Sequence, residues 1–311
     1  MAKPSKYQVR NWREYNLSLI ARGSLLLWID DAVIRDWYAQ AEPNHAGFQK
    51  VYSDTCIQSA LQLKFMYKLT LRAVQGLLES LFDLLNLDIQ VPSYSTLCRR
   101  QRQLKTHIYK PHMSQENIVL AIDSTGLKVF GEGEWKTRMH GYDYRRVWRK
   151  LHLAIDVSTQ AIEAVVLSTN DFKDGELLED LLDQIEVSIE KVLADGVYES
   201  FANYESVAAR EAVPIIPPRR DAKVSCSDAD NPTRMRDSVV GDIQAIGLKQ
   251  WKQQRGYYLR NLVETTMYRF KQLFGDTLSA RSFESQLVEA IEKCSMLNLL
   301  TRLGMPDGRM A

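Results

Sequence analysis

The sequence has 311 residues, of which 45% are hydrophobic and 25% charged, and its net charge at pH 7 is only +1. Such a composition is that of a globular protein with ample core, and it excludes a disordered or low-complexity chain. The four cysteines form no CxxC pair and the five histidines no HExxH pattern, which argues against a zinc site or a disulfide framework. No apolar run could span a membrane and no secretory signal is recognisable, so we expect a protein of the reducing cytoplasm with no membrane partner.

Charge is unevenly distributed along the chain. Residues 1–112 carry 15 lysines and arginines against 9 acidic residues, whereas the remainder carries 25 against 30. The basic residues cluster near position 100, at 136–150 and at 249–281, and an acidic stretch lies at 171–190. This distribution is compatible with contacts to phosphate groups, and alone it is weak evidence for them.

The first part of the chain has the apolar spacing of helices. Residues 54–68 and 70–85 predict two helices, the second capped by Thr70, and residues 93–105 predict a short basic helix capped by Ser93 or Ser95. Two helices joined in this way indicate a helix-turn-helix that would enter a major groove of DNA, although a plain helical bundle with a basic end fits equally well. We therefore expect residues 1–112 to form an all-α N-terminal DNA-binding region. The candidate residues of its helix-turn-helix are Ser95, Arg99, Arg100 and Arg102.

From residue 117 the pattern changes to that of strands. We expect a first strand that ends at Gly126, then two strands at 150–158 and 161–168 joined by a turn at Thr159 and Gln160. An acidic helix, a strand ending at Asp195, a helix near 201–210 and a strand at 213–218 follow. This order predicts an α/β domain at 113–311, with a mixed sheet flanked by helices on both faces. Residues 219–256 interrupt the order as an insertion, and residues 283–303 predict a closing helix.

The run YYLRNLVETTMYRFK predicts a helix with two different faces. At about 100° per residue, Tyr257, Arg260, Glu264 and Lys271 fall within about 60° of one another. The opposite side gathers Leu259, Leu262, Val263, Thr266, Phe270 and Leu273. A charged stripe opposite an apolar face is usually only a solvated surface, so this stripe needs support from elsewhere in the chain.

Two aspartates supply that support. Asp123 and Asp195 are each expected to end a buried strand and to be followed by turn-forming residues, where α/β sheets commonly bind ligands. Together with Glu264 they would form an oxygen-rich pocket for two Mg²⁺ or Mn²⁺ ions. For each aspartate the alternative is a loop-capping role, of which Asp156 could be an example. Paired carboxylates also serve glycosidases, but the cations beside Glu264 favour a phosphate.

Other candidate contacts are less specific. Aromatic and basic residues alternate at 135–150, as on surfaces that contact DNA, and we expect Lys136, Arg138 and Arg146 to bind its backbone. Arg219 and Arg220 follow the last strand, where the chain leaves the sheet near the candidate site. We expect His140 and His152 to be structural, and Trp251 to belong to the core rather than to stack on a base.

Several segments together carry a resemblance to a known family. These are AIDSTG, GEGEWKTRMHGYDYRRVWRKLHLAID, LADGVYES, IIPPRRDA and the spacing YxxRxxxExxxxxxK followed by LFGD. They resemble the transposases of bacterial insertion sequences, most closely the insertion-sequence-five family of the DDE class, over about residues 52–306. The resemblance implies a ribonuclease-H-like (retroviral-integrase-like) fold. It makes Asp123, Asp195 and Glu264 the catalytic and metal-binding acids, and it maps the phosphate-binding signature onto Tyr257, Arg260 and Lys271.

The function implied is that of a DNA transposase. Such an enzyme would bind the terminal inverted repeats of its element, cleave the ends by metal-dependent hydrolysis, and join the 3′-hydroxyls to target DNA by transesterification. Its cofactor would be Mg²⁺ or Mn²⁺ and its partner double-stranded DNA, on which a homo-oligomer would assemble in the bacterial cytoplasm, associated with the nucleoid. A nuclease of the same fold that does not join strands, and a DNA-binding repressor without catalysis, are the alternatives.

Overall fold

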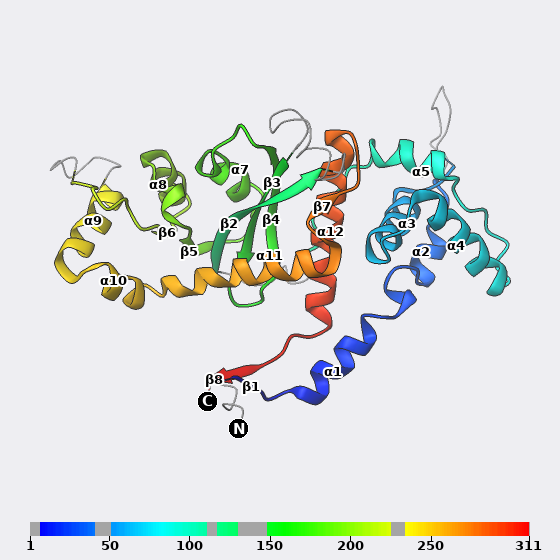
Figure 1. The fold of residues 1–311 in the computed structure, drawn as a ribbon, viewed down its shortest axis with the longest axis horizontal. Coiled ribbons are helices and arrows are strands. Elements are labelled where there is room, and N and C mark those ends of the chain that lie inside the picture. The colour runs from blue at the N-terminus through cyan, green and yellow to red at the C-terminus, as the bar shows by residue number, and fades with distance from the viewer. Residues whose placement is uncertain (1–6, 41–50, 111–116, 130–147, 225–233, 311) are drawn as a thin grey trace, which may run out of the picture. The chain divides into compact units, whose positions relative to one another are not determined.

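The computed structural model describes residues 7–40, 51–110, 117–129, 148–224 and 234–310 (Figure 1). Its contacts divide the chain into two compact units. The first comprises residues 1–109 and 282–311, and the second residues 110–281. The closing helix at 283–303, which we expected in the second domain, thus belongs with the N-terminal residues.

The first unit consists mainly of helices. They are α1 (Trp12–Ala21), η1 (Leu25–Leu27), α2 (Asp31–Arg35), α3 (Asp54–Met66), α4 (Leu71–Leu84), α5 (Tyr94–Gln101) and α12 (Phe283–Leu303). A two-stranded antiparallel sheet pairs β1 (Tyr7–Val9) with β8 (Gly308–Met310). We expected the N-terminal region to be all-α, but it also contains the strand β1 and is therefore not entirely helical.

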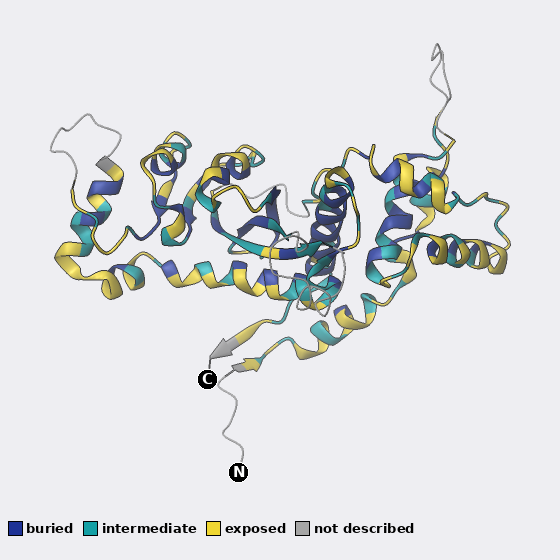
Figure 2. Cartoon of the chain, turned by 45° about the horizontal axis from the view of Figure 1, so that its top comes forward, coloured by how far each residue is buried: buried dark blue, intermediate teal, exposed yellow. Residues whose placement is uncertain are grey.

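Side-chain caps explain where several of these helices begin. Ser53, Thr70 and Ser93 each accept a hydrogen bond from the backbone N–H three residues later, which satisfies one of the free donors of the first turn. Helix α12 packs against α3, and most residues of both helices are buried (Figure 2). In this contact the amides of Gln58 and Gln62 donate to the carboxylate of Glu292, at 3.1 and 3.0 Å.

The second unit is built on a six-stranded mixed sheet. Its strands are β2 (Ile118–Val129), β3 (Trp148–Asp156), β4 (Ile162–Thr169), β5 (Ile189–Leu193), β6 (Val213–Ile215) and β7 (Thr277–Leu278). The order is β4-β3-β2-β5-β6, with β7 beside the end of β2. Pairs β2–β3 and β3–β4 are antiparallel, whereas β2–β5, β5–β6 and β2–β7 are parallel. The expected mixed sheet is therefore present.

Helices cover both faces of this sheet, again as expected. They are η2 (Asp174–Leu177), α7 (Leu178–Leu182), η3 (Gly196–Tyr198), α8 (Phe201–Ala208), α9 (Arg234–Ile246), α10 (Leu248–Gln254), η4 (Tyr257–Arg260) and α11 (Asn261–Phe274). On one face Leu120 and Ile122 pack with α7 and α8. Val119, which alternates with them along β2, packs with Trp251 and Tyr257. Side chains at odd positions of β2 therefore face η4 and α11.

The structure corrects three details of the expected elements. Strand β2 does not end near Asp123 or Gly126, because pairing with β3 and β7 continues it to Val129. The helix expected from residue 257 is interrupted: η4 follows the left-handed Gly256 (φ +69°), and α11 begins at Asn261. Leu259, expected in the core, is consequently exposed. The acidic stretch forms only the short η2 and α7.

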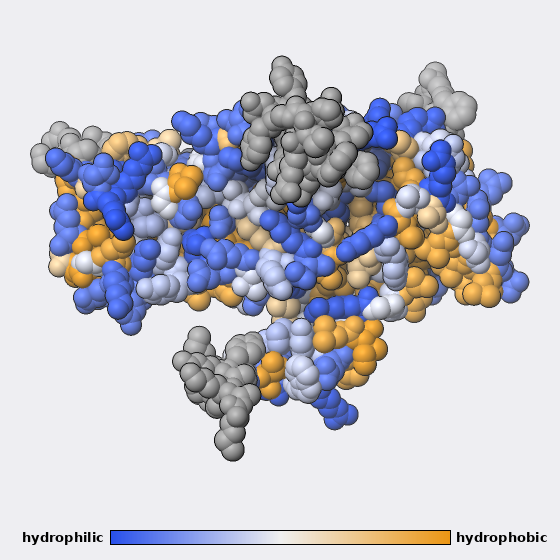
Figure 3. All heavy atoms as spheres, viewed as in Figure 1, coloured by the Kyte–Doolittle hydropathy of each residue, from blue (hydrophilic) through white to orange (hydrophobic). Residues whose placement is uncertain are grey.

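No helix in the described parts of the chain is long and apolar enough to cross a lipid bilayer. On the face seen in Figure 3, hydrophilic and hydrophobic side chains are intermixed, as is common on the surfaces of globular proteins.

Candidate active site

Asp123 lies in the middle of β2, on a strand that is paired on both sides. Its neighbour Ala121 pairs with Leu193 of β5, so Asp123 lies one pleat beyond the last residue of β5, beside the segment that contains Asp195. Asp195 caps η3, because its Oδ1 accepts from the backbone N–H of Val197 at 2.9 Å. Asp123 thus lies on β2, and Asp195 lies two residues beyond the end of the adjacent parallel strand β5, where its negative charge acts on Asp123.

Arg260 joins two of the three predicted acids. Its guanidinium donates to Oδ2 of Asp123 at 2.8 Å and also to the carboxylate of Glu264, one helical turn further along. Asp123 is mostly buried, with 19% of its side chain exposed, whereas that of Glu264 is 52% exposed. Tyr257 places its ring beside the same guanidinium, 5.9 Å from ring centroid to Cζ. The polar stripe predicted from the sequence is therefore not merely a solvated surface, because Arg260 turns inward to β2.

The electrostatics of Asp123 reflect this position. Burial raises its pKa above the usual value, and the negative charge of Asp195 acts in the same direction. The backbone N–H of Ser124, at 2.8 Å from Oδ1, and the guanidinium of Arg260 partly offset the increase. A buried carboxylate that retains such donors is held in place for contact with a cation.

Lys271, the last member of the signature, contacts the same strand. Its ammonium donates to Oγ1 of Thr125 at 2.6 Å, two residues along β2 from Asp123. Tyr257, Arg260, Glu264 and Lys271 are therefore gathered along the side of β2 that carries Asp123.

Two residues beside the site were not identified from the sequence. Asp174, in the acidic stretch that we expected to form a helix, accepts from Ser124 Oγ at 2.8 Å and from Lys150 Nζ at 2.9 Å. Burial acts to raise its pKa, but these two donors outweigh burial and lower it. The second residue, Tyr198, is completely buried three positions after Asp195. Neither residue belongs to a spacing pattern that could have indicated its role.

Whether a divalent metal ion fits this site depends on the side-chain atoms that could bind it. Among the described residues no three acidic, histidine or cysteine side chains are gathered closely enough to hold an ion as they stand. The donor type does fit, since Asp123 and Glu264 converge on a single cationic group and Asp195 adjoins Asp123. Arg260 therefore supplies the positive charge that this carboxylate pair requires.

The other predicted contacts are only partly described. Lys136, Arg138, His140 and Arg146 lie outside the described residues. In the first unit Ser95, Arg99 and Arg102 are exposed on and after α5. Arg100 is not, with 5% exposure, because it donates to the carboxylate of Asp54 and to the carbonyl of Tyr52. Its side chain ties α5 to α3 and is not presented to a groove of DNA.

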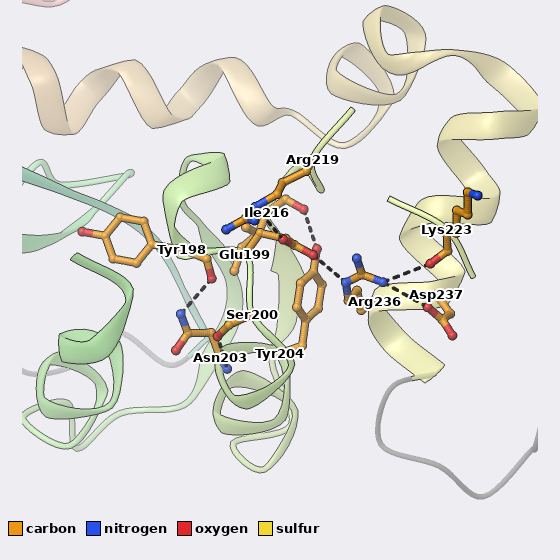
Figure 4. A network of polar contacts seen from close by, with 10 residues as sticks. All are labelled: Tyr198, Glu199, Ser200, Asn203, Tyr204, Ile216, Arg219, Lys223, Arg236 and Asp237. Carbon is orange, nitrogen blue, oxygen red and sulfur yellow. Dashed lines mark hydrogen bonds and ion pairs between the residues drawn. The ribbon is translucent and has the colours of Figure 1, made fainter. Parts of the chain in front are cut away.

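Arg219 belongs to a separate polar network, shown in Figure 4. Its side chain is exposed and lies 3.6 Å from the carboxylate of Glu199. The same carboxylate accepts from Arg236 of α9 at 2.5 Å, and Arg236 in turn contacts Asp237 and the carbonyl of Lys223. This network fastens the inserted helix α9 to the segment after η3.

Three residues have the structural roles that we expected for them. The carboxylate of Asp156 accepts from the backbone and hydroxyl groups of Ser158 and Thr159, so it caps the turn after β3. His152 is buried and shares a hydrogen bond with Ser168, at 2.9 Å from Nε2 to Oγ. Trp251 is buried in the core between α10 and the sheet.

These features define an α/β protein with an acidic site beside the central strand of a mixed sheet. A family model described as a transposase DDE domain matches residues 114–299, more than half of the chain, and a second model of the same description matches residues 20–132. The chain therefore belongs to the DDE transposase family.

A solved structure with some similarity is that of the Drosophila P element transposase strand transfer complex. The identity is 17% and the TM-score 0.29, over 57% of this chain. The matched region spans 40% of that solved chain.

Proposed function

We propose that this protein is a DNA transposase that cleaves the ends of its own element and joins them to target DNA. The observation that carries the proposal is the convergence of Asp123 and Glu264 on Arg260, with Asp195 just after the adjacent strand β5, in a chain of the DDE transposase family. The strand order β4-β3-β2-β5-β6, with three antiparallel strands followed by two parallel ones, supports a ribonuclease-H-like domain. Its element would be a bacterial insertion sequence of the insertion-sequence-five family.

In this proposal Asp123, Asp195 and Glu264 hold the cofactor, Mg²⁺ or Mn²⁺. Bound there as two ions, it would lower the pKa of the attacking water or 3′-hydroxyl and stabilise the departing oxygen of the phosphodiester. Asp123 is fixed by Ser124, and Asp195 by the N–H of Val197, so neither has to be ordered when substrate arrives.

The cations of the signature would then bind the DNA. Arg260, once it exchanges Asp123 and Glu264 for a phosphate, can make two parallel hydrogen bonds to its oxygens. Lys271 and Tyr257 lie on the same side of β2 and would orient the neighbouring phosphate. Both cleavage and joining are in-line displacements at phosphorus, so one site can carry out both steps.

Recognition of the inverted repeats is assigned to the first unit, where α4 and α5 would form the helix-turn-helix. Its DNA-facing residues would be Ser95, Arg99 and Arg102, with Lys136, Arg138 and Arg146 of the second unit as further backbone contacts. Because two ends must be processed together, a homo-oligomer on DNA is part of the proposal, as is its place in the bacterial cytoplasm, associated with the nucleoid.

The test uses a labelled duplex that carries the inverted repeats bracketing the gene, incubated with full-length protein in Mg²⁺ or in EDTA. We expect metal-dependent nicking at the repeat tip, joining of that end to a supercoiled plasmid, and loss of both in Glu264→Gln. The matched control is Glu205→Gln, an exposed glutamate on α8 of the same unit, which should cut like the wild type.

Other outcomes separate the alternatives. Nicking without joining would make the protein a nuclease of the same fold. Binding of the repeats without any metal-dependent cut would make it a DNA-binding repressor. Cutting that Glu264→Gln leaves intact would refute the proposed site.

A further inference from the structure

Helix α11 exposes one large aromatic side chain, that of Tyr268, which is 63% exposed. The structure describes every residue of this helix, and its other large hydrophobic side chains are buried or half-buried. A single exposed tyrosine is ordinary on a protein surface. The place of this one is not, because it lies one helical turn after Glu264 and about one turn before Lys271.

Helix geometry fixes the direction in which Tyr268 points. At about 100° per residue, it lies about 40° from Glu264 around the helix axis. The buried Val263 and Phe270 lie about 140–160° from it, so its ring points to the exposed side of the helix (Figure 2). Residues four apart on a helix have their Cβ atoms about 5–6 Å apart. The ring of Tyr268 therefore stands beside Glu264, on the side turned away from the packed face.

The residues on the two sides of Glu264 differ in charge. The cations of the signature point inward to β2. Arg260 donates to Asp123 at 2.8 Å. Lys271 donates to Thr125 at 2.6 Å. The exposed residues of α11 other than Glu264 carry no charge, and they are Asn261, Thr265, Tyr268 and Gln272. A DNA strand bound here would therefore turn its phosphates towards β2 and its bases towards Tyr268.

One base of the substrate has a face free for an aromatic ring. Exposed aromatic side chains bind bases by stacking, and they accept any base because each has a flat π face. Inside a duplex both faces of a base are covered by its neighbours. Cleavage at the repeat tip removes one neighbour, so the terminal base of the cut end acquires a free face. The 3′-hydroxyl of the same nucleotide would lie at the metal site, beside Glu264, which brings this base within reach of Tyr268.

We propose that Tyr268 is a stacking site for the terminal base of the cleaved DNA end. The inference rests on the proposed function, because it assumes that Glu264 holds the metal and that the phosphates meet Arg260 and Lys271. It assigns the contact to the face of the ring and none to the hydroxyl. Stacking of this kind holds the cut end, with its 3′-hydroxyl in place, between cleavage and joining.

The experiment uses full-length protein and a precleaved duplex that carries the inverted repeat. The fluorescent base 2-aminopurine, whose emission falls when it stacks, replaces the terminal base of the strand with the 3′-hydroxyl. A second duplex carries the same probe well inside the repeat. Binding is measured in EDTA, which prevents joining, and the Kd is taken from the anisotropy of a dye on the far end of the duplex.

The variants separate stacking from other roles of the side chain. Tyr268→Ala should abolish the fall in emission at the terminal position and raise the Kd for the precleaved duplex about tenfold. Tyr268→Phe should behave as the wild type, because it keeps the ring. The matched control is Tyr258→Ala, which removes another exposed tyrosine of the same unit, on η4 before α11 begins, and should also behave as the wild type. All three variants should unfold at the temperature of the wild type, because both tyrosines lie on the surface.

Two results would overturn the inference alone. One is a fall in emission that Tyr268→Ala leaves unchanged, and the other is a loss of this signal in Tyr268→Phe as well, which would assign the contact to the hydroxyl. In both cases metal-dependent nicking of the uncleaved duplex by the wild type would show that the proposed function stands. If the wild type neither binds nor nicks that duplex, the inference and the proposed function are both overturned.

Discussion

Arg260 donates to Asp123 across 2.8 Å, although 137 residues separate the two in the chain. The contact joins η4 to the central strand of the sheet, and it gives a mostly buried carboxylate its counter-charge. The charge balance of the metal-free site therefore depends on a residue that, in the proposed function, serves the DNA. Arg260 thus links metal binding to substrate binding.

Replacing Arg260 by glutamine should expose this dependence. Without metal, Arg260→Gln should lower the free energy of unfolding by about 2 kcal/mol, because Asp123 and Glu264 lose their cationic partner. Added Mn²⁺ should stabilise the variant more than the wild type, since the ion no longer competes with the guanidinium. Calorimetry with and without Mn²⁺ measures both effects.

The control for this experiment is Arg255→Gln, which removes an exposed ion pair with Asp242 and should change stability by about 0.5 kcal/mol or less. Equal stability of Arg260→Gln and the wild type in the absence of metal would contradict the assigned role of Arg260.

His152 should make stability depend on pH in a defined window. Burial lowers its pKa to about 4, with the charge of Asp174 acting in the opposite direction, whereas the unfolded value is about 6.5. The folded protein thus binds fewer protons, and a contribution of roughly 3 kcal/mol that is complete above pH 6.5 is lost as the pH falls towards 4. Denaturant unfolding across this range should show that the wild type loses about 3 kcal/mol relative to His152→Gln as the pH falls from 6.5 towards 4. His107→Gln, at an exposed position, should show the same loss as the wild type.

Glu292 should have the opposite effect. Burial raises its pKa to about 6, although hydrogen bonds from Gln62 and Gln58 act to lower it. Because the folded protein then binds more protons than the unfolded one, the stability that this group contributes is complete below about pH 4.5 and is lost as the pH rises through 6. Relative to the wild type, Glu292→Gln should therefore gain about 2 kcal/mol between pH 4.5 and 7. A difference that stays constant with pH would show that Glu292 titrates normally.

Gly304, directly after α12, should not tolerate a side chain. Its φ is +148°, and a Cβ there would lie 2.8 Å from the Cβ of Ser18. We expect Gly304→Ala to destabilise the protein by about 1–3 kcal/mol. Gly241 in α9, where a Cβ would meet no described atom within 4 Å, is the control: Gly241→Ala should be neutral or stabilising by up to about 1 kcal/mol. Chemical denaturation of the two variants would measure the contrast.

Local sequence patterns predicted most of the fold, and long-range pairing explains what they did not predict. Apolar spacing located α3, α4 and α12 to within a few residues, and Thr70 was correctly expected to cap α4. The strand predicted from the sequence was shorter than β2 is, because the last residues of β2 pair with β7, a two-residue strand with no sequence pattern of its own. The pairing of β1 with β8 likewise joins residues about 300 positions apart, which no local signal can reveal.

For the candidate site, the sequence predicted neighbours within one helix better than contacts between elements. The i,i+4 spacing placed Arg260 beside Glu264, and the structure has this contact. It could not show that Arg260 also turns towards Asp123, because that contact depends on how η4 packs against β2. The sequence did not predict the position of Asp174 beside the site for a similar reason, since only folding brings this residue to Ser124.

The division of the chain into units has a consequence for its synthesis. The first unit is assembled from both ends of the sequence, residues 1–109 and 282–311, with the whole second unit encoded between them. During synthesis on the ribosome, the apolar side chains of α3 that pack on α12 therefore lack their partner until the 216 residues between Met66 and Phe283, and then α12 itself, have been made, at roughly 5–20 residues per second. A transcript that ends before α12 would yield a chain in which the apolar side chains of α3 that pack on this helix stay uncovered, and exposed apolar surface of this kind makes a chain prone to aggregation.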